Sequence, residues 1–160
     1  MMKKTSSFLL CVLFGIYVLL AGCGNQETGH TERESNKEEN SAVKMSVNVN
    51  GQDFTATLEQ NSAADALVQM IESGPVTLQL TDYAGFEKVG PLGRSLPASN
   101  SQTTTHAGDI VLYQGNQIVM FYGSNSWSYT RLGCIDDLTG WEEALGSGDV
   151  TVTLSMEETE

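Results

Sequence analysis

Apolar and polar residues alternate along several short segments of the chain, a pattern typical of half-buried β-strands. The first two such segments are 45–50 and 52–58. Between them lies Asn50-Gly51, a pair preferred in tight hairpin turns. The other segments expected to form strands are 76–83, 109–123 (as a hairpin), 128–136 and 148–156. The pattern therefore predicts a mainly β domain of seven to eight strands.

One segment has helical spacing instead. Four apolar residues recur at intervals that place them on one face of a helix: Ala64, Leu67, Val68 and Ile71. Asn61 or Ser62 can cap the start of this helix, and Gly74-Pro75 follows its end. We expect one clear capping helix over residues 62–73 and a second, short helical turn within 137–145.

The segment 84–108 is rich in Gly, Pro, Ser and Thr and is predicted to be a long loop. A loop of this length in a small domain either carries function or covers the end of a barrel. So many short strands in about 115 residues are best accommodated by a sheet closed into a β-barrel, because closure removes the exposed strand edges.

The start of the chain has the features of a targeting segment. Lys3 and Lys4 precede an apolar stretch over 8–20, which is shorter than the roughly 20 residues that a membrane-spanning helix needs. The run Leu-Ala-Gly-Cys that ends at Cys23 resembles the bacterial lipobox. This resemblance implies that residues 1–22 are a lipoprotein signal peptide and that Cys23 becomes the lipidated mature N-terminus. The alternative is a membrane-spanning anchor that ends in Gly-Cys.

A polar, acidic segment follows Cys23. In 24–44 only Ala42 and Val43 have apolar side chains, so this segment cannot bury enough surface to fold, and we expect 23–44 to be a disordered tether. The folded domain is then expected over 45–160. Lipid on Cys23 would hold it at the extracytoplasmic face of the cell membrane.

The charge of the chain limits its partners. The formal net charge is −12 at pH 7, and the cations within 45–160 are Lys88, Arg94 and Arg131, against 15 acidic residues. Such a domain repels phosphate backbones, which excludes nucleic acid as a partner.

Cys134 is the one cysteine after Cys23, so we expect no internal disulfide and a buried free thiol.

Motifs for metal or cofactor chemistry are absent from the sequence. It contains no glycine-rich phosphate loop, no Cys or His cluster with metal spacing, and no Gly-x-Ser-x-Gly. His106 is the one histidine of the 45–160 domain and is expected on a surface loop. We therefore predict no cofactor and no metal.

Two longer stretches resemble a bacterial family of cyclophilin-like domains. They are "FEKVGPLGRSLP" (86–97) and "AGDIVLYQGNQIVMFYG" (107–123), and the likeness extends over 45–156. The resemblance implies a closed β-barrel with a capping helix. Cyclophilin isomerases resemble one another through a Phe-His-Arg run, which this sequence lacks. A lipid-anchored, non-catalytic binding or accessory module is therefore expected; the alternative is a peptidyl-prolyl isomerase with a rearranged site that assists exported proteins.

Two arginines and four aromatic residues are the candidates for binding a proline-containing peptide or an exported protein. Arg131 or Arg94 can donate to a peptide carbonyl, although Arg131 is also expected to form an ion pair with Asp136, Asp137 or Glu87. The aromatic candidates for an apolar wall are Phe121, Tyr122, Trp127 and Tyr129. Trp127 and Tyr129 lie in a polar run, so we expect both to be partly exposed.

Glu87 is the third catalytic candidate. It is surrounded by apolar residues in the sequence, which allows a buried acid with a raised pKa. The alternative that we favour is that its carboxylate accepts backbone N–H groups of the long loop, because such loops need internal hydrogen bonds.

Overall fold

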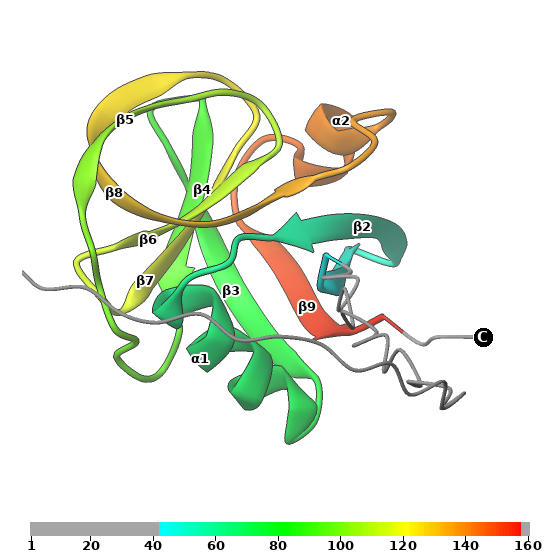
Figure 1. The fold of residues 1–160 in the computed structure, drawn as a ribbon. Coiled ribbons are helices and arrows are strands. Elements are labelled where there is room, and N and C mark those ends of the chain that lie inside the picture. The colour runs from blue at the N-terminus through cyan, green and yellow to red at the C-terminus, as the bar shows by residue number, and fades with distance from the viewer. Residues whose placement is uncertain (1–41, 158–160) are drawn as a thin grey trace, which may run out of the picture. The chain divides into compact units, whose positions relative to one another are not determined.

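The computed structural model describes residues 42–157, which are mainly β (Figure 1). The chain forms nine strands and two helices in this part. Their bounds are β1 Lys44–Val49, β2 Gln52–Leu58, α1 Ser62–Glu72, β3 Val76–Tyr83, β4 Glu87–Pro91, β5 Ser101–Thr105, β6 Asp109–Tyr113, β7 Gln117–Phe121, β8 Asn125–Ile135, α2 Trp141–Leu145 and β9 Val150–Met156. Cys23, the signal peptide predicted over 1–22 and most of the predicted tether lie outside the described residues.

All strand pairs are antiparallel, and the order across the sheet is β2-β1-β9-β3-β4-β7-β6-β8-β5. β2 also pairs with β8 through Ala56–Ile135, Thr57–Cys134 and Leu58–Gly133. The hydrogen-bonded order therefore returns from β8 to β2, and β5 extends from β8 alone.

The predicted strand number is too low, because the segment 84–108 contains two strands instead of one continuous loop. β4 begins with two charged residues, Glu87 and Lys88, which are both buried, and it ends in Gly-Pro, so its sequence lacks the alternation of a half-buried strand. β5 is entirely polar, so it carries no hydrophobic signal. It forms because β8 offers it a hydrogen-bonding edge, from Ser101–Tyr129 to Thr105–Asn125.

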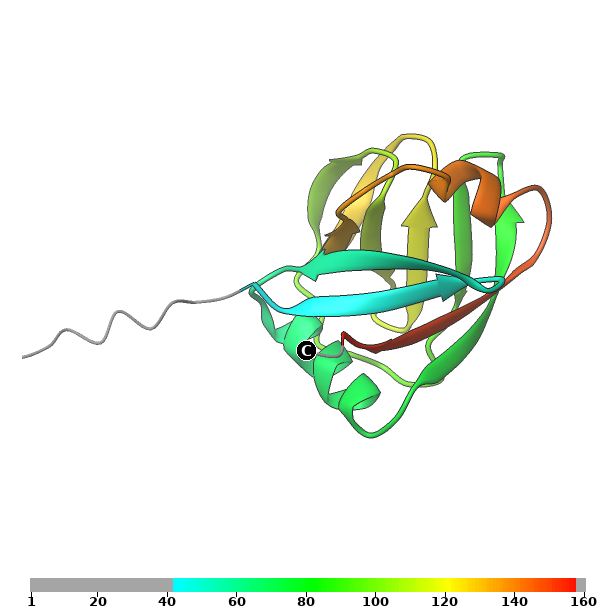
Figure 2. The same ribbon diagram turned by 90° about the vertical axis from the view of Figure 1, so that its right-hand side faces the viewer.

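The helix predicted over 62–73 is confirmed as α1. Asn61 caps it, since its Oδ1 accepts hydrogen bonds from the backbone N–H groups of Ala63 and Ala64, both at 3.0 Å. Leu67 and Ile71 are buried in the main core. Figures 1 and 2 both show α1 and α2 at opposite ends of the strand arrangement. Neither helix in the described part of the chain has the length and apolar character that crossing a membrane requires.

β6 and β7 are buried on both faces, and this creates a second apolar cluster. One set of side chains, which includes Ile110 and Met120, belongs to the main core. The alternate residues Val111, Val119 and Phe121 pack with Tyr129 on the opposite face. The part of β8 that contains Tyr129 pairs with β5, whereas its later part pairs with β6 and β2. β8 therefore passes from the sheet to the outer face of β6 and β7, where the pocket described next is found.

Candidate functional site

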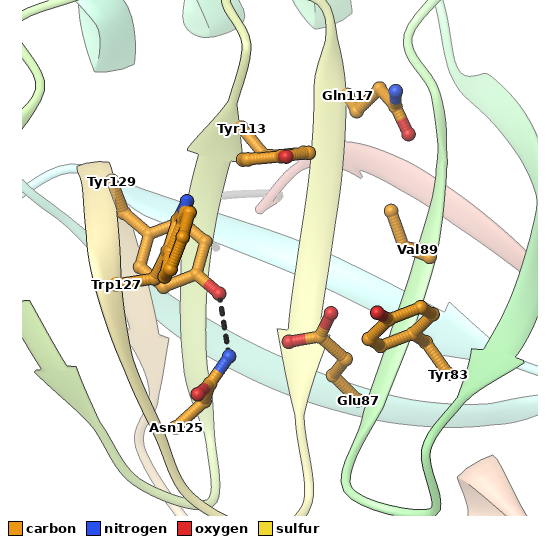
Figure 3. A pocket seen from close by; sticks show the side chains of 8 residues that line it. All are labelled: Tyr83, Glu87, Val89, Tyr113, Gln117, Asn125, Trp127 and Tyr129. Atoms are coloured by element: carbon orange, nitrogen blue, oxygen red, sulfur yellow. Dashed lines mark hydrogen bonds between the residues drawn. The ribbon is translucent and has the colours of Figure 1, made fainter.

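A pocket of about 360 Å³ lies over the outer face of β4, β7 and β6 (Figure 3). Its lining comes from five strands: Tyr83 of β3, Glu87 and Val89 of β4, Tyr113 of β6, Gln117 of β7, and Asn125, Trp127 and Tyr129 of β8. The volume falls within the range of pockets that hold small ligands or single side chains.

Aromatic rings form the walls of the pocket. Tyr129 is only 4% exposed, and its ring packs edge-on against Phe121 below it at 5.7 Å and against Tyr113 at 6.1 Å. Its hydroxyl accepts a hydrogen bond of 3.0 Å from Asn125 Nδ2. Trp127 and Tyr83 are each 58% exposed and stand at the mouth, so a ligand would meet them first. The expected exposure of Trp127 is confirmed, and that of Tyr129 is wrong because β8 turns this ring onto the second apolar cluster.

Glu87 supplies the negative charge of the pocket. It is 6% exposed, and Oε2 is buried without a hydrogen-bond partner. Figure 3 shows its carboxylate between Tyr83 on one side and Tyr129 with Asn125 on the other. Burial raises the pKa of Glu87 from 4.5 to about 7. The alternative that we favoured, a carboxylate that accepts loop N–H groups, is therefore wrong for Oε2.

The adjacent residue Lys88 points to the opposite face of β4, because side chains alternate along a strand. It is fully buried, and its Nζ donates to Asp82 Oδ1 at 2.8 Å, Gly146 O at 2.8 Å and Gly148 O at 2.7 Å. Lys88 is therefore paired with Asp82 on the opposite face of β4, and its charge does not compensate the charge of Glu87.

Tyr122 belongs to the Lys88 side as well and not to the pocket. Its hydroxyl donates a hydrogen bond to Asp82, and Lys88 Nζ lies 5.3 Å from the centroid of its ring. Burial and then the Asp82 carboxylate raise the pKa of Tyr122 to about 12. Phe121, the last residue of β7, is fully buried beneath the pocket and contacts Tyr129 without lining the cavity.

Neither candidate arginine lines the pocket. Arg131 pairs with Asp109, with 3.1 Å between Nη1 and Oδ1. None of the three expected partners is correct, because Arg131 is in register with Val111 of β6, and Asp109 lies two residues before Val111 on the same strand. Arg94 is exposed in the segment between β4 and β5.

Among residues 42–157, the remaining cation is Lys44, which pairs with Asp136 at 2.6 Å. Three of the four lysines and arginines in this range are therefore held by carboxylates other than Glu87, and the fourth, Arg94, is not a lining residue. The same part of the chain has no cluster of three or more metal-ligating side chains. The arrangement suits a ligand that supplies apolar surface and a positive charge or a hydrogen-bond donor.

Five lining residues are not among the sequence candidates: Tyr83, Val89, Tyr113, Gln117 and Asn125. Alternation in β4 places Val89 on the same face as Glu87, and the β6–β7 hairpin pairs Tyr113 with Gln117. Both signals were available in the sequence once β4 was recognised as a strand.

Cys134 is exposed, so the expectation of a buried thiol is wrong: the buried residues at this end of β8 are its neighbours Gly133 and Ile135. His106 is exposed as expected.

The strand order and the pocket define a small, mainly β domain with a pocket on the outer face of its sheet. The chain belongs to the cyclophilin-like family, whose model matches residues 47–155. A hypothetical protein from Archaeoglobus fulgidus, solved in solution, has a similar fold: the TM-score is 0.52 at 12% identity, over 76% of this chain and 99% of that one. No curated protein sequence matches the chain.

Proposed function

We propose that the chain is a lipid-anchored, extracytoplasmic binding module, and that the pocket around Glu87 is where it binds segments of exported polypeptides. The observation that carries this proposal is a pocket with four aromatic rings and no arginine among its lining residues. Cyclophilin isomerases use an arginine to polarise the peptide carbonyl, as the sequence resemblance implies, and the two candidate arginines lie elsewhere. The pocket therefore favours binding over prolyl isomerisation.

The aromatic lining supports a polypeptide ligand that contains proline. Flat rings offer a large apolar surface with little loss of side-chain freedom, and Tyr83 and Trp127 are exposed enough to be reached by an extended chain. Gln117 and Asn125 add amide groups that can bond to a peptide backbone.

The membrane location is supported by the sequence alone. The basic start, the apolar stretch over 8–20 and the lipobox-like run that ends at Cys23 are consistent with lipid attachment outside the cytoplasm. The β2–β8 pairing supports the further view that the sheet is a closed cyclophilin-like barrel, which would leave the outer face of β4, β7 and β6 as a rigid floor for the ligand.

A paired measurement tests the proposal. The mature chain (residues 23–160) with Cys23→Ser, which lacks the predicted lipidation site, is assayed for cis–trans exchange of a proline-containing peptide and for binding of the same peptide. We expect binding that Trp127 fluorescence reports, with no exchange above the uncatalysed rate. Catalysed exchange would contradict the binding-only function, and absence of any binding would contradict the pocket as the site.

A further inference from the structure

Glu87 is a buried carboxylate that forms no ion pair with any described residue. Glu87 Oε2 is buried and unpartnered, which is unusual because a buried charge is normally paired or hydrogen-bonded. The cations of residues 42–157 that form ion pairs are held by Asp82, Asp109 and Asp136. The protein thus keeps this carboxylate available in a cavity that opens to solvent between Tyr83 and Trp127.

Aromatic rings surround this carboxylate. Tyr83, Tyr113, Trp127 and Tyr129 line the same cavity as Glu87. The face of an aromatic ring attracts a cation, with Trp the strongest, and the attraction grows when water is excluded. A carboxylate at the floor with rings around it is therefore complementary to an organic cation that has an apolar stem, and it is less suited to a neutral prolyl ring alone.

The charge of the whole chain acts in the same direction. Its formal net charge of −12 attracts cations to the surface and raises their rate of encounter at low ionic strength. Metal ions are a poor match, because a hard cation needs several oxygen ligands and the described residues bring no three carboxylate, His or Cys groups together.

We propose that the pocket binds an organic cation, namely the ammonium or guanidinium group of a lysine or arginine side chain, with Glu87 as its counter-ion and Tyr83, Trp127 and Tyr129 as its walls. This inference rests on the proposed function, since it specifies which side chain of the bound polypeptide enters the pocket. Binding gives the buried carboxylate a partner of opposite charge, which offsets part of the free energy lost on burying Glu87.

The experiment compares two blocked hexapeptides, Ala-Ala-Lys-Pro-Ala-Ala and the same peptide with norleucine in place of lysine, on the Cys23→Ser mature chain. Norleucine keeps the apolar stem and removes the charge. We expect the lysine peptide to bind about tenfold more tightly at pH 8, by Trp127 fluorescence. A third probe, n-butylammonium, distinguishes a polypeptide source from a free amine: equal affinity for it favours a small amine, and tighter lysine-peptide binding favours a side chain.

Two variants make the test specific. Glu87→Gln keeps the shape of the side chain and is expected to remove the preference for lysine over norleucine. Glu72→Gln removes the same charge from the exposed end of α1, outside the pocket, and is expected to keep the preference. Equal binding of the two peptides to the native chain would overturn the cation inference and leave the binding module in place. Failure of both peptides to bind would overturn both.

Discussion

Arg131 Nη1 lies 3.1 Å from Asp109 Oδ1, and Arg131 Nη2 also donates to Thr104 O at 3.5 Å. The guanidinium joins β8 to β5 and to the start of β6, and Arg131 does not line the pocket. Its role in the structure is thus to hold the strands that surround the site.

The first prediction concerns Arg131→Ala. This ion pair is partly exposed, so its removal should lower the free energy of unfolding by about 1 kcal/mol or less. Binding of the lysine hexapeptide should stay within about twofold, because no contact with the ligand is lost. Chemical denaturation and Trp127 fluorescence measure the two effects, and a tenfold loss of binding would mean that the arginine reaches the ligand.

The second prediction concerns the dependence of stability on pH. Burial raises the pKa of Glu87 in the folded state to about 7, above its value of 4.5 when solvated. The folded state therefore favours the protonated form. The stability that this preference provides is fully present below pH 4.5 and is lost as pH rises through 7. We expect the free energy of unfolding to fall by about 1–2 kcal/mol between pH 5.5 and pH 8, after allowance for solvent in the open pocket.

Glu87→Gln is the test of that assignment. The variant should lose this slope and be more stable than the native chain at pH 8, whereas Glu72→Gln should keep the slope. The carboxylates whose pKa is lowered, Asp82, Asp136 and Asp137, lose their contribution only in acid, below the window of this measurement. An unchanged slope in Glu87→Gln would show that another group titrates.

The third prediction concerns the contact between β2 and β8. A Cβ placed at Gly133 would lie 2.4 Å from Thr57 O, a backbone atom of β2 that cannot move without the strand. Gly133→Ala should therefore destabilise the protein by about 1–3 kcal/mol through overpacking. Cys134→Ala changes the adjacent exposed side chain and should stay within about 0.5 kcal/mol of the native chain. Equal stabilities of the two variants would show that the β2–β8 pair contributes little.

The fourth prediction concerns membrane attachment. Cys23→Ala should abolish labelling by a fatty-acid probe and leave the precursor uncleaved, because the variant lacks the cysteine that the lipobox resemblance identifies as the lipidated N-terminus. Cys11→Ala, within the apolar stretch, is the matched control and should be labelled and processed normally. Labelled, processed Cys23→Ala protein would show that the anchor lies elsewhere.

Much of the fold could be predicted from the sequence, since alternation and the Asn50-Gly51 pair identify β1 and β2, and Asn61 marks the start of α1. The polar strand β5 could not be predicted in this way. Its Ser, Gln and Thr residues give no hydrophobic period, and it depends on the edge of β8, a non-local partner.

The residues that line the pocket were harder to predict, because they depend on which face of a strand each side chain occupies. Glu87, Trp127 and Tyr129 were identified. Phe121 at the end of β7 and the next residue, Tyr122, point to opposite sides, and neither lines the pocket. For Arg131 the sequence suggested Asp136, Asp137 or Glu87, whereas its partner Asp109 is brought near by the β6–β8 pairing. Register across strands carries this information, and local sequence does not.

The most direct test of the central claim is a map of amide chemical shifts. The ¹⁵N-labelled mature chain with Cys23→Ser is titrated with the lysine hexapeptide. We predict that the perturbed amides cluster on β4 and the first part of β8, around Glu87 and Trp127, and that Glu87→Gln reduces these shifts. Perturbations confined to α1 or to the Asp82–Lys88–Tyr122 side would contradict the claim that the outer-face pocket is the binding site.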